Sequence, residues 1–212
     1  RQMCIRDRFD SSIGEWLASY EEDCVVARER TRESAPSSPL ELFFAPIKKK
    51  RASLLIEKAV ELGATSLRPV KTQRTEKASV QALPAPGATA SAVAAAEQSE
   101  RLDVPLLEAV VDVAADGLGG DVPLFVCAER SDEASPGLLD ALVARADETR
   151  RRGVALLVGP EGGFSDADLD AVRAARPDAV FVSLGTAVLR AETACWAGLA
   201  VASAARARST TS

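Results

Sequence analysis

A parallel α/β fold is the architecture that this sequence predicts, and two observations point to it. Short, continuous apolar runs such as residues 154–158 (VALLV) are typical of strands that are buried on both faces, as in a parallel sheet. Between these runs lie segments with helical spacing of apolar side chains, such as residues 50–62, so strands and helices alternate along the chain. We therefore expect one sheet covered by helices on both faces, with ligands bound at the carboxyl ends of its strands.

The predicted elements follow a regular order after a short β segment. Residues 15–20 and 24–27 alternate between polar and apolar side chains and indicate two short strands, and residues 34–39, rich in Pro and Ser, indicate a linker. The strands expected in the α/β region are residues 40–47, 65–70, 122–128, 154–158 and 179–184. The helices expected there are residues 50–62, 90–99, 136–148, 165–176 and 190–205, with a Pro- and Gly-rich loop at residues 82–89.

Local signals support several helix ends. Gly63 is a C-terminal stop for the helix over residues 50–62. Ser165, with Asp168 three residues later, predicts a capping box in which Asp replaces the better Glu. The last helix is apolar nearly all round from residue 194 to residue 205, so we expect it to be buried in a large core or against another subunit.

Composition excludes several classes of function. The chain has no histidine, which excludes Ser-His-Asp and Cys-His mechanisms. Its cysteines (Cys4, Cys24, Cys127 and Cys195) form no CxxC pair, so they indicate buried or incidental thiols and no bound metal is expected. No apolar run is long enough to span a bilayer and no signal-peptide pattern is present, so we expect a cytoplasmic protein without a membrane partner. The net charge of −5 does not exclude an RNA partner, because phosphate contacts need only local positive charge.

Two glycine-bearing bends follow the last two predicted strands. Residues 159–164 (GPEGGF) place three glycines in five positions, which permits close approach of a ligand to main-chain amides; the alternative is a plain tight turn. This loop is neither a Walker A loop nor a GxGxxG fingerprint. Residues 185–194 (GTAVLRAETA) combine a glycine bend with Arg190 and Glu192 at a helix start. The alternative for these two residues is a surface salt bridge, which would contribute little to stability.

These motifs resemble the signature of a known family. The segments LLVGPEGGFSDADL and VSLGTAVLRAETA, in this order and at this separation, look like the paired motifs of RsmE-type methyltransferases of the SPOUT superfamily. The segments KKRASLLIEKAVELGATSLRPVKTQRTE, AAEQSERLDVP and FDSSIGEW agree, so that the resemblance covers roughly residues 9–208. It implies a SPOUT α/β knot: a parallel sheet flanked by helices, with a deep C-terminal trefoil knot that holds the cofactor. It also implies a homodimer.

The resemblance implies a division of the chain as well. Residues 40–208 correspond to the SPOUT methyltransferase domain, and residues 9–36 to a truncated remnant of the PUA-like β domain with which the family begins. Residues 1–8 (RQMCIRDR) fit no element, and we expect them to be an artefact-like N-terminus outside the fold. Ala187 stands where the family usually has Arg.

The activity implied is methylation of N3 of a uridine in 16S (small-subunit) ribosomal RNA, with S-adenosylmethionine as cofactor and with the RNA or the assembled 30S subunit as partner. Because the N3 proton must leave, we expect Arg190 to stabilise the developing anion, and Glu161, Glu192 or water to accept the proton. The strand end at residues 127–129 (Cys127, Ala128 and Glu129) matches the family's first knot loop. The cofactor-binding residues implied are Gly159, Pro160, Glu161, Gly162, Gly163, Leu184, Gly185, Val188 and Leu189.

Basic residues outside the glycine bends form two runs. Each run alone is more often a solvated face, but together, beside a predicted methyl-transfer site, they indicate a track for RNA phosphates. The predicted RNA-binding residues are Lys48, Lys49, Arg51, Arg68, Lys71 and Arg74.

Other functions stay open at this point. One is a different SPOUT RNA methyltransferase that modifies the ribose 2′-oxygen, although the last motif disfavours it. Another is a truncated, non-catalytic protein that binds RNA or cofactor without turnover. An ordinary α/β nucleotide-binding protein is disfavoured, because the sequence has no phosphate-loop motif.

Overall fold

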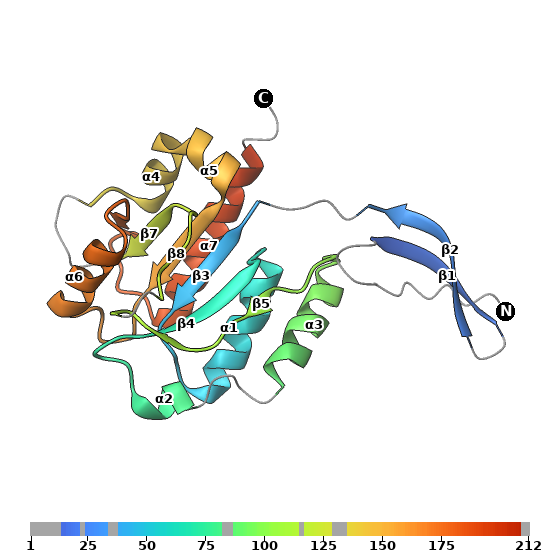
Figure 1. Ribbon diagram of the computed structural model, residues 1–212, viewed down its shortest axis with the longest axis horizontal. Helices are drawn as coiled ribbons and strands as arrows, with labels where there is room; N and C mark the ends of the chain where they lie inside the picture. The colour runs from blue at the N-terminus through green and yellow to red at the C-terminus, as the bar shows by residue number, and fades with distance from the viewer. Residues whose placement is uncertain are drawn as a thin grey trace.

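The computed structural model describes residues 14–21, 24–33, 38–81, 87–114, 117–128 and 135–208. A parallel sheet forms the centre of this structure, with its strands in the order β5-β4-β3-β8-β7-β9 (Figure 1). The strands are β3 (Leu40–Phe44), β4 (Ser66–Lys71), β5 (Leu106–Leu107), β7 (Leu124–Cys127), β8 (Val154–Val158) and β9 (Val180–Val182), and β6 (Val111–Asp112) pairs in parallel with β4. The predicted α/β fold is therefore confirmed.

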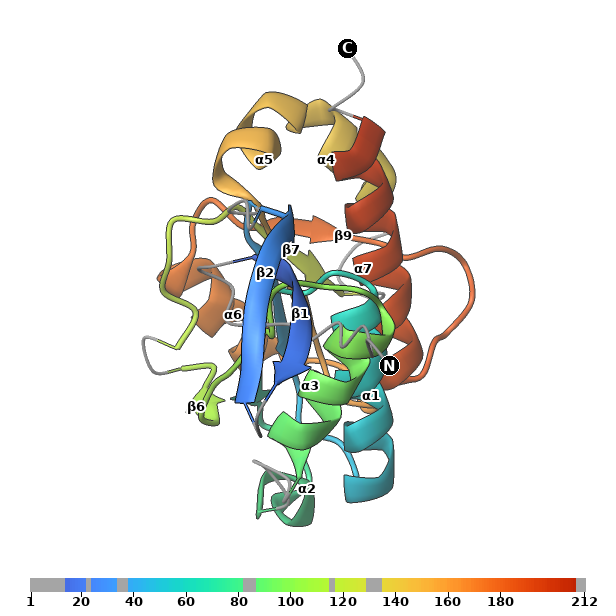
Figure 2. The ribbon, with the colours of Figure 1, turned by 90° about the vertical axis from the view of Figure 1, so that its right-hand side faces the viewer.

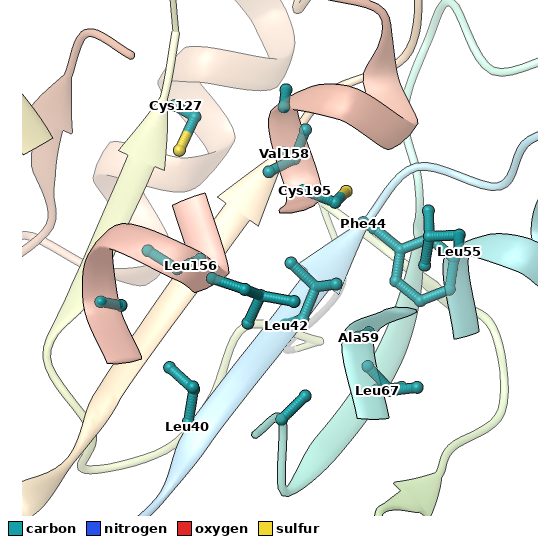
Figure 3. Close-up of a cluster of buried hydrophobic side chains, with 14 of the residues drawn as sticks. Leu40, Leu42, Phe44, Leu55, Ala59, Leu67, Cys127, Leu156, Val158 and Cys195 are labelled. Atoms are coloured by element: carbon teal, nitrogen blue, oxygen red, sulfur yellow. The ribbon is translucent and has the colours of Figure 1, made fainter. Parts of the chain in front are cut away.

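Helices cover both faces of the sheet (Figure 2). On one face, side chains from α1 (Lys49–Glu61), α3 (Ala88–Gln98), α4 (Leu138–Ala144) and α7 (Ala191–Arg208) form a core with the strands. Figure 3 shows part of this core, where Leu42 of β3 and its register partner Leu156 of β8 are both fully buried. α6 (Asp166–Ala175) packs Val172 into a second core on the opposite face. No helix in the described residues combines the length and the hydropathy that a bilayer-spanning segment needs.

Some predicted element bounds need correction. The helix expected over residues 136–148 is two helices, α4 and α5 (Ala146–Arg152), because the backbone leaves the helical conformation at Arg145, where φ is −113° and ψ is 26°. The helix expected from residue 90 begins at Ala88, directly after Gly87 with its left-handed φ of 83°, so the end of the predicted loop belongs to α3. Three short elements, α2 (Lys77–Gln81), β5 and β6, were not predicted, because they are too short to show a period.

The two strands before the α/β region form an antiparallel ribbon that projects from the sheet (Figure 1). β1 (Glu15–Glu21) agrees with the prediction, whereas β2 (Cys24–Arg32) is longer than expected, because its exposed, charged second half shows no apolar alternation. Arg32 Nη2 donates to the carbonyl oxygen of Glu100 at 2.7 Å and joins the ribbon to the body. The predicted artefact-like N-terminus and most of the predicted linker lie outside the described residues. The interpretation of the ribbon as a PUA-like remnant stays a prediction.

Candidate functional site

A cavity of about 330 Å³ lies at the carboxyl ends of β7, β8 and β9, and its size is in the range of pockets that bind a small cofactor. The predicted glycine bends after β8 and β9 form its two main walls. The residues that line it are Arg74, Cys127, Ala128, Val158, Gly159, Pro160, Glu161, Gly162, Gly163, Phe164, Asp166, Leu169, Leu184, Val188, Leu189, Ala191 and Ala194. The structure thus brings together all the predicted cofactor residues except Gly185, which turns the second bend with a φ of 124°. The predicted Glu129 lies outside the described residues.

The first bend is held by a hydrogen bond within it and by the helix cap that follows it. Gly163 N donates to the carbonyl oxygen of Pro160 at 2.8 Å, and the φ of Gly163 is 69°, in the left-handed region that glycine adopts without strain. The predicted capping box at the start of α6 is confirmed: Asp168 N donates to Ser165 Oγ at 3.2 Å, and Ser165 N donates to Asp168 Oδ2 at 2.9 Å. The bend therefore presents a fixed main chain to the cavity.

Alanine at position 159 is expected to weaken binding of the implied cofactor. A Cβ atom there would lie 2.9 Å from Phe164 Cε2, closer than real contacts, and this ring lines the same cavity. The ring must shift, and we expect the Kd for S-adenosylmethionine to rise about tenfold in calorimetry, which corresponds to about 1.4 kcal/mol. If the contact with the ring is the cause, adding Phe164→Leu to Gly159→Ala should recover part of the loss. A double variant that binds no better than Gly159→Ala would contradict this explanation.

A single guanidinium connects the two walls of the cavity. Arg51, from α1, places Nη1 at 2.6 Å from Glu161 Oε1 in the first bend and at 3.4 Å from Glu192 Oε1 at the start of α7. Glu192 is buried, and its Oε2 has no hydrogen-bond partner in the described part of the chain, whereas Glu161 is mostly exposed. Two predicted catalytic carboxylates are thus held together by a residue that was predicted to bind RNA.

Arg190, the predicted catalytic cation, lies at the edge of the cavity. Its neighbours in the chain, Leu189 and Ala191, line the cavity, but Arg190 itself is exposed and does not. It forms no ion pair with any described residue. The alternative expectation of an Arg190–Glu192 salt bridge is wrong, because Glu192 pairs with Arg51 instead.

The predicted RNA-binding residues divide into two groups. Arg68 makes two hydrogen bonds of 2.6 Å with Glu108 and lies over the ring of Phe43, and Lys71 pairs with Asp112 at 3.3 Å. Burial alone would raise the pKa of Glu108, but hydrogen bonds from Arg68 and from a serine lower it overall. Arg68 is therefore occupied by a structural ion pair on the sheet.

In the second group, two arginines contact residues that line the cavity. Arg51 contacts Glu161, and Arg74 Nη1 donates to the carbonyl oxygen of Gly162 at 2.7 Å. Lys48 lies 3.9 Å from Glu76 in a fully exposed pair, and the side chain of Lys49 lies outside the described part. RNA binding by these residues stays a prediction.

Several lining residues were not predicted to bind the cofactor, and Phe164, Asp166 and Arg74 are three of them. Phe164 and Asp166 directly follow the GPEGG segment, and Arg74 lies in the turn after the carboxyl end of β4. The rule that ligands bind at the carboxyl ends of parallel strands could have found Arg74, had it been applied to β4 as well as to the last strands.

The thiols and carboxylates suggest no further chemistry at this site. Cys127 and Cys195 are buried, as predicted, and burial raises the pKa of the Cys195 thiol well above its ordinary value. Cys24 is exposed, and Cys4 lies outside the described residues. Within the described ranges, no three Cys, Asp or Glu side chains form a group that could hold a metal ion.

Comparison with known proteins gives consistent similarities. The family described as RNA methyltransferase domain matches residues 33–203 of this chain. The ribosomal RNA small subunit methyltransferase E of Rickettsia conorii is 30% identical over 199 residues, which cover 91% of this chain and 77% of that protein.

Solved structures agree with the sequence similarity. A Legionella pneumophila protein, assigned as a methyltransferase and solved with its bound cofactor S-adenosylmethionine, is 25% identical with a TM-score of 0.69, over 97% of this chain and 83% of the other. The small subunit methyltransferase E of Neisseria gonorrhoeae, bound to S-adenosylmethionine, is 22% identical with a TM-score of 0.64, over 88% of this chain and 76% of the other. Because the Neisseria gonorrhoeae protein is only 22% identical to this chain, its similarity shows a shared fold alone.

Proposed function

This chain belongs to the family of RNA methyltransferase domains, and we propose that it transfers the methyl group of S-adenosylmethionine to N3 of a uridine in small-subunit ribosomal RNA. The identity to the Rickettsia conorii enzyme supports this substrate class. The observation that carries the proposal is one cavity that both glycine bends line, at the edge of the sheet where parallel α/β proteins bind their ligands.

The cavity suits the cofactor in size and in the polarity of its lining. Its lining includes the apolar side chains of Val158, Leu184, Leu189 and Ala194, which suit a nucleoside, and it also includes the first bend and several charged side chains. A Cβ atom at Gly163 would meet nothing within 4 Å, so the bend leaves open space beside its backbone. When bound there, S-adenosylmethionine supplies an electrophilic methyl group on a sulfonium centre.

The chain's own residues would prepare the acceptor base. A uracil N3–H is a weak acid, so its proton has to leave before or during methyl transfer. In the proposal, the guanidinium of Arg190 stabilises the negative charge that then develops on the carbonyl oxygens. Glu161 lines the cavity and keeps Oε2 available beside its contact with Arg51, so it is better placed than the buried Glu192 to take the proton. Glu192 then serves to hold Arg51.

Several finer features complete the proposal. We propose a trefoil knot around the cavity, a homodimer, and action in the cytoplasm on the free RNA or on the assembled 30S subunit. The homodimer is supported by α7, where Ala197, Ala200 and Val201 leave an apolar, partly exposed face. We propose that Lys48, Lys49, Arg51 and Lys71 contribute positive charge toward RNA, and that Arg68 does so least, because Glu108 already neutralises it.

Nucleoside analysis of methylated subunits tests the proposed function. The protein is incubated with isotope-labelled S-adenosylmethionine and small ribosomal subunits or their naked RNA, with large subunits as the control substrate. Digestion and mass spectrometry should find label in N3-methyluridine from small-subunit RNA alone. Label in a 2′-O-methylated nucleoside would support the ribose-modifying alternative instead. Cofactor binding without any transfer would support the non-catalytic alternative.

A further inference from the structure

Two opposite charges line the cavity without a charged partner. Arg74 donates one hydrogen bond to the carbonyl oxygen of Gly162 and forms no ion pair with any described residue. The side chain of Asp166 has neither a hydrogen bond nor an ion pair within the described ranges. The two also lie too far apart to pair with each other. By contrast, Arg51, another basic side chain near the cavity, already has carboxylate partners.

Arg74 is held in place, unlike an ordinary surface arginine. Its turn is closed by hydrogen bonds of 3.0 Å from Thr72 N to Thr75 Oγ1 and of 3.1 Å from Thr75 N to Thr72 O. Gln73 N donates to the buried carboxylate of Asp168 at 2.9 Å, which ties this turn to the start of α6. The aliphatic part of Arg74 lies against Gly162: a Cβ atom added to Gly162 would lie 3.5 Å from Arg74 Cδ. Because the side chain is pre-positioned, binding an anion there costs little ordering entropy.

The charges of Arg74 and Asp166, which both line the cavity, complement an amino-acid zwitterion. Arg74 offers donors for a carboxylate, and charge-assisted hydrogen bonds of this kind are among the stronger ones in proteins. Asp166, which also lines the cavity, offers an acceptor for an ammonium group. Glu161 is a weaker candidate for the ammonium, because one of its oxygens already accepts from Arg51 at 2.6 Å.

We propose that Arg74 and Asp166 form an amino-acid subsite: Arg74 binds the α-carboxylate and Asp166 the α-ammonium of a ligand whose nucleoside fills the apolar part of the cavity. This assignment rests on the proposed function, in which that ligand is S-adenosylmethionine. It separates Arg74 from the RNA phosphate track that the sequence predicted for it.

Calorimetry with two nucleosides tests the subsite. S-adenosylhomocysteine carries the amino-acid group, whereas 5′-methylthioadenosine keeps the nucleoside and the thioether but lacks that group. Arg74→Gln should raise the Kd of S-adenosylhomocysteine about tenfold, and Asp166→Asn should raise it by a smaller factor. Both variants should leave the Kd of 5′-methylthioadenosine within about twofold of the wild-type value, because the lost contacts are absent from that ligand. Arg74→Lys should recover part of the loss, and Arg150→Gln, at an exposed site on α5, is the matched control.

Each other outcome overturns a stated part of the assignment. If Arg74→Gln weakens both nucleosides equally, Arg74 only shapes the bend. If it leaves both affinities unchanged but raises the KM for RNA, Arg74 binds a phosphate of the substrate and the subsite does not exist. If the folded wild-type protein binds neither nucleoside, the proposed function itself fails, and the subsite fails with it.

Discussion

Replacement of Arg190 by alanine is expected to lower kcat for methyl transfer by about 10²–10³-fold, the usual effect of removing one donor that stabilises a developing anion. Arg190 stands between two residues that line the cavity, and no described carboxylate neutralises it. It is therefore available to an acceptor base that arrives at the cavity from solvent. Because Arg190 does not itself line the cavity, the Kd for S-adenosylmethionine should stay within about twofold of the wild-type value.

Single-turnover assays at saturating RNA, with calorimetry for the cofactor, measure the two quantities separately. Urea unfolding should show a change in the free energy of unfolding within about 0.5 kcal/mol, because the Arg190 side chain makes no ion pair in the described structure. Arg150→Ala, at an exposed position on the helix that precedes β8, is a control expected to keep normal turnover. Arg190→Lys should keep part of the activity, since it keeps the charge but not the planar donors. Wild-type turnover by Arg190→Ala would remove the catalytic role assigned to this residue.

The order of the main strands and helices could be predicted because burial on both faces leaves a clear pattern. Residues 154–158 form β8 and are all buried, so this short apolar run by itself predicts a buried strand. The break at Arg145 could not be predicted in the same way. No Pro or Gly lies between Gly137 and Gly153, so nothing in the local sequence interrupts the helical pattern, and the tertiary packing of α4 and α5 sets the break.

The candidate site was predictable where its chemistry is local and not where it depends on distant contacts. Both glycine bends are contiguous in sequence, and each supplies one wall of the cavity. The ion pair of Arg51 with Glu161 spans 110 positions, and the hydrogen bond from Arg74 to Gly162 spans 88 positions. Sequence spacing suggested only the nearby pair of Arg190 and Glu192, as an alternative, whereas the order of the strands decides which charges meet.

Asp168→Ala is expected to lower the free energy of unfolding by about 2–4 kcal/mol, the largest stability effect we predict. The side chain of Asp168 is 3% exposed. Its Oδ2 accepts from Ser165 N at 2.9 Å and from Ser165 Oγ at 2.7 Å, and its Oδ1 accepts from Gln73 N at 2.9 Å. Truncation removes the Asp168 half of the capping box and leaves the main-chain N–H groups of Ser165 and Gln73 without their acceptor. Urea or thermal unfolding measures the loss.

The same substitution should also weaken cofactor binding, because Asp168 joins the turn that carries Arg74 to the downstream end of the first glycine bend. Asp168→Asn should cost less than Asp168→Ala, since an amide keeps one acceptor oxygen for one of these two segments. Asp170→Ala is the matched control on the same helix: its exposed pair with Arg173 should contribute at most about 1 kcal/mol. Equal losses of stability in Asp168→Ala and Asp170→Ala would show that the buried carboxylate does not tie the two segments. If Asp168→Ala lowers stability but leaves cofactor affinity unchanged, Asp168 joins the Arg74 turn to the first bend but does not position the cofactor-binding residues.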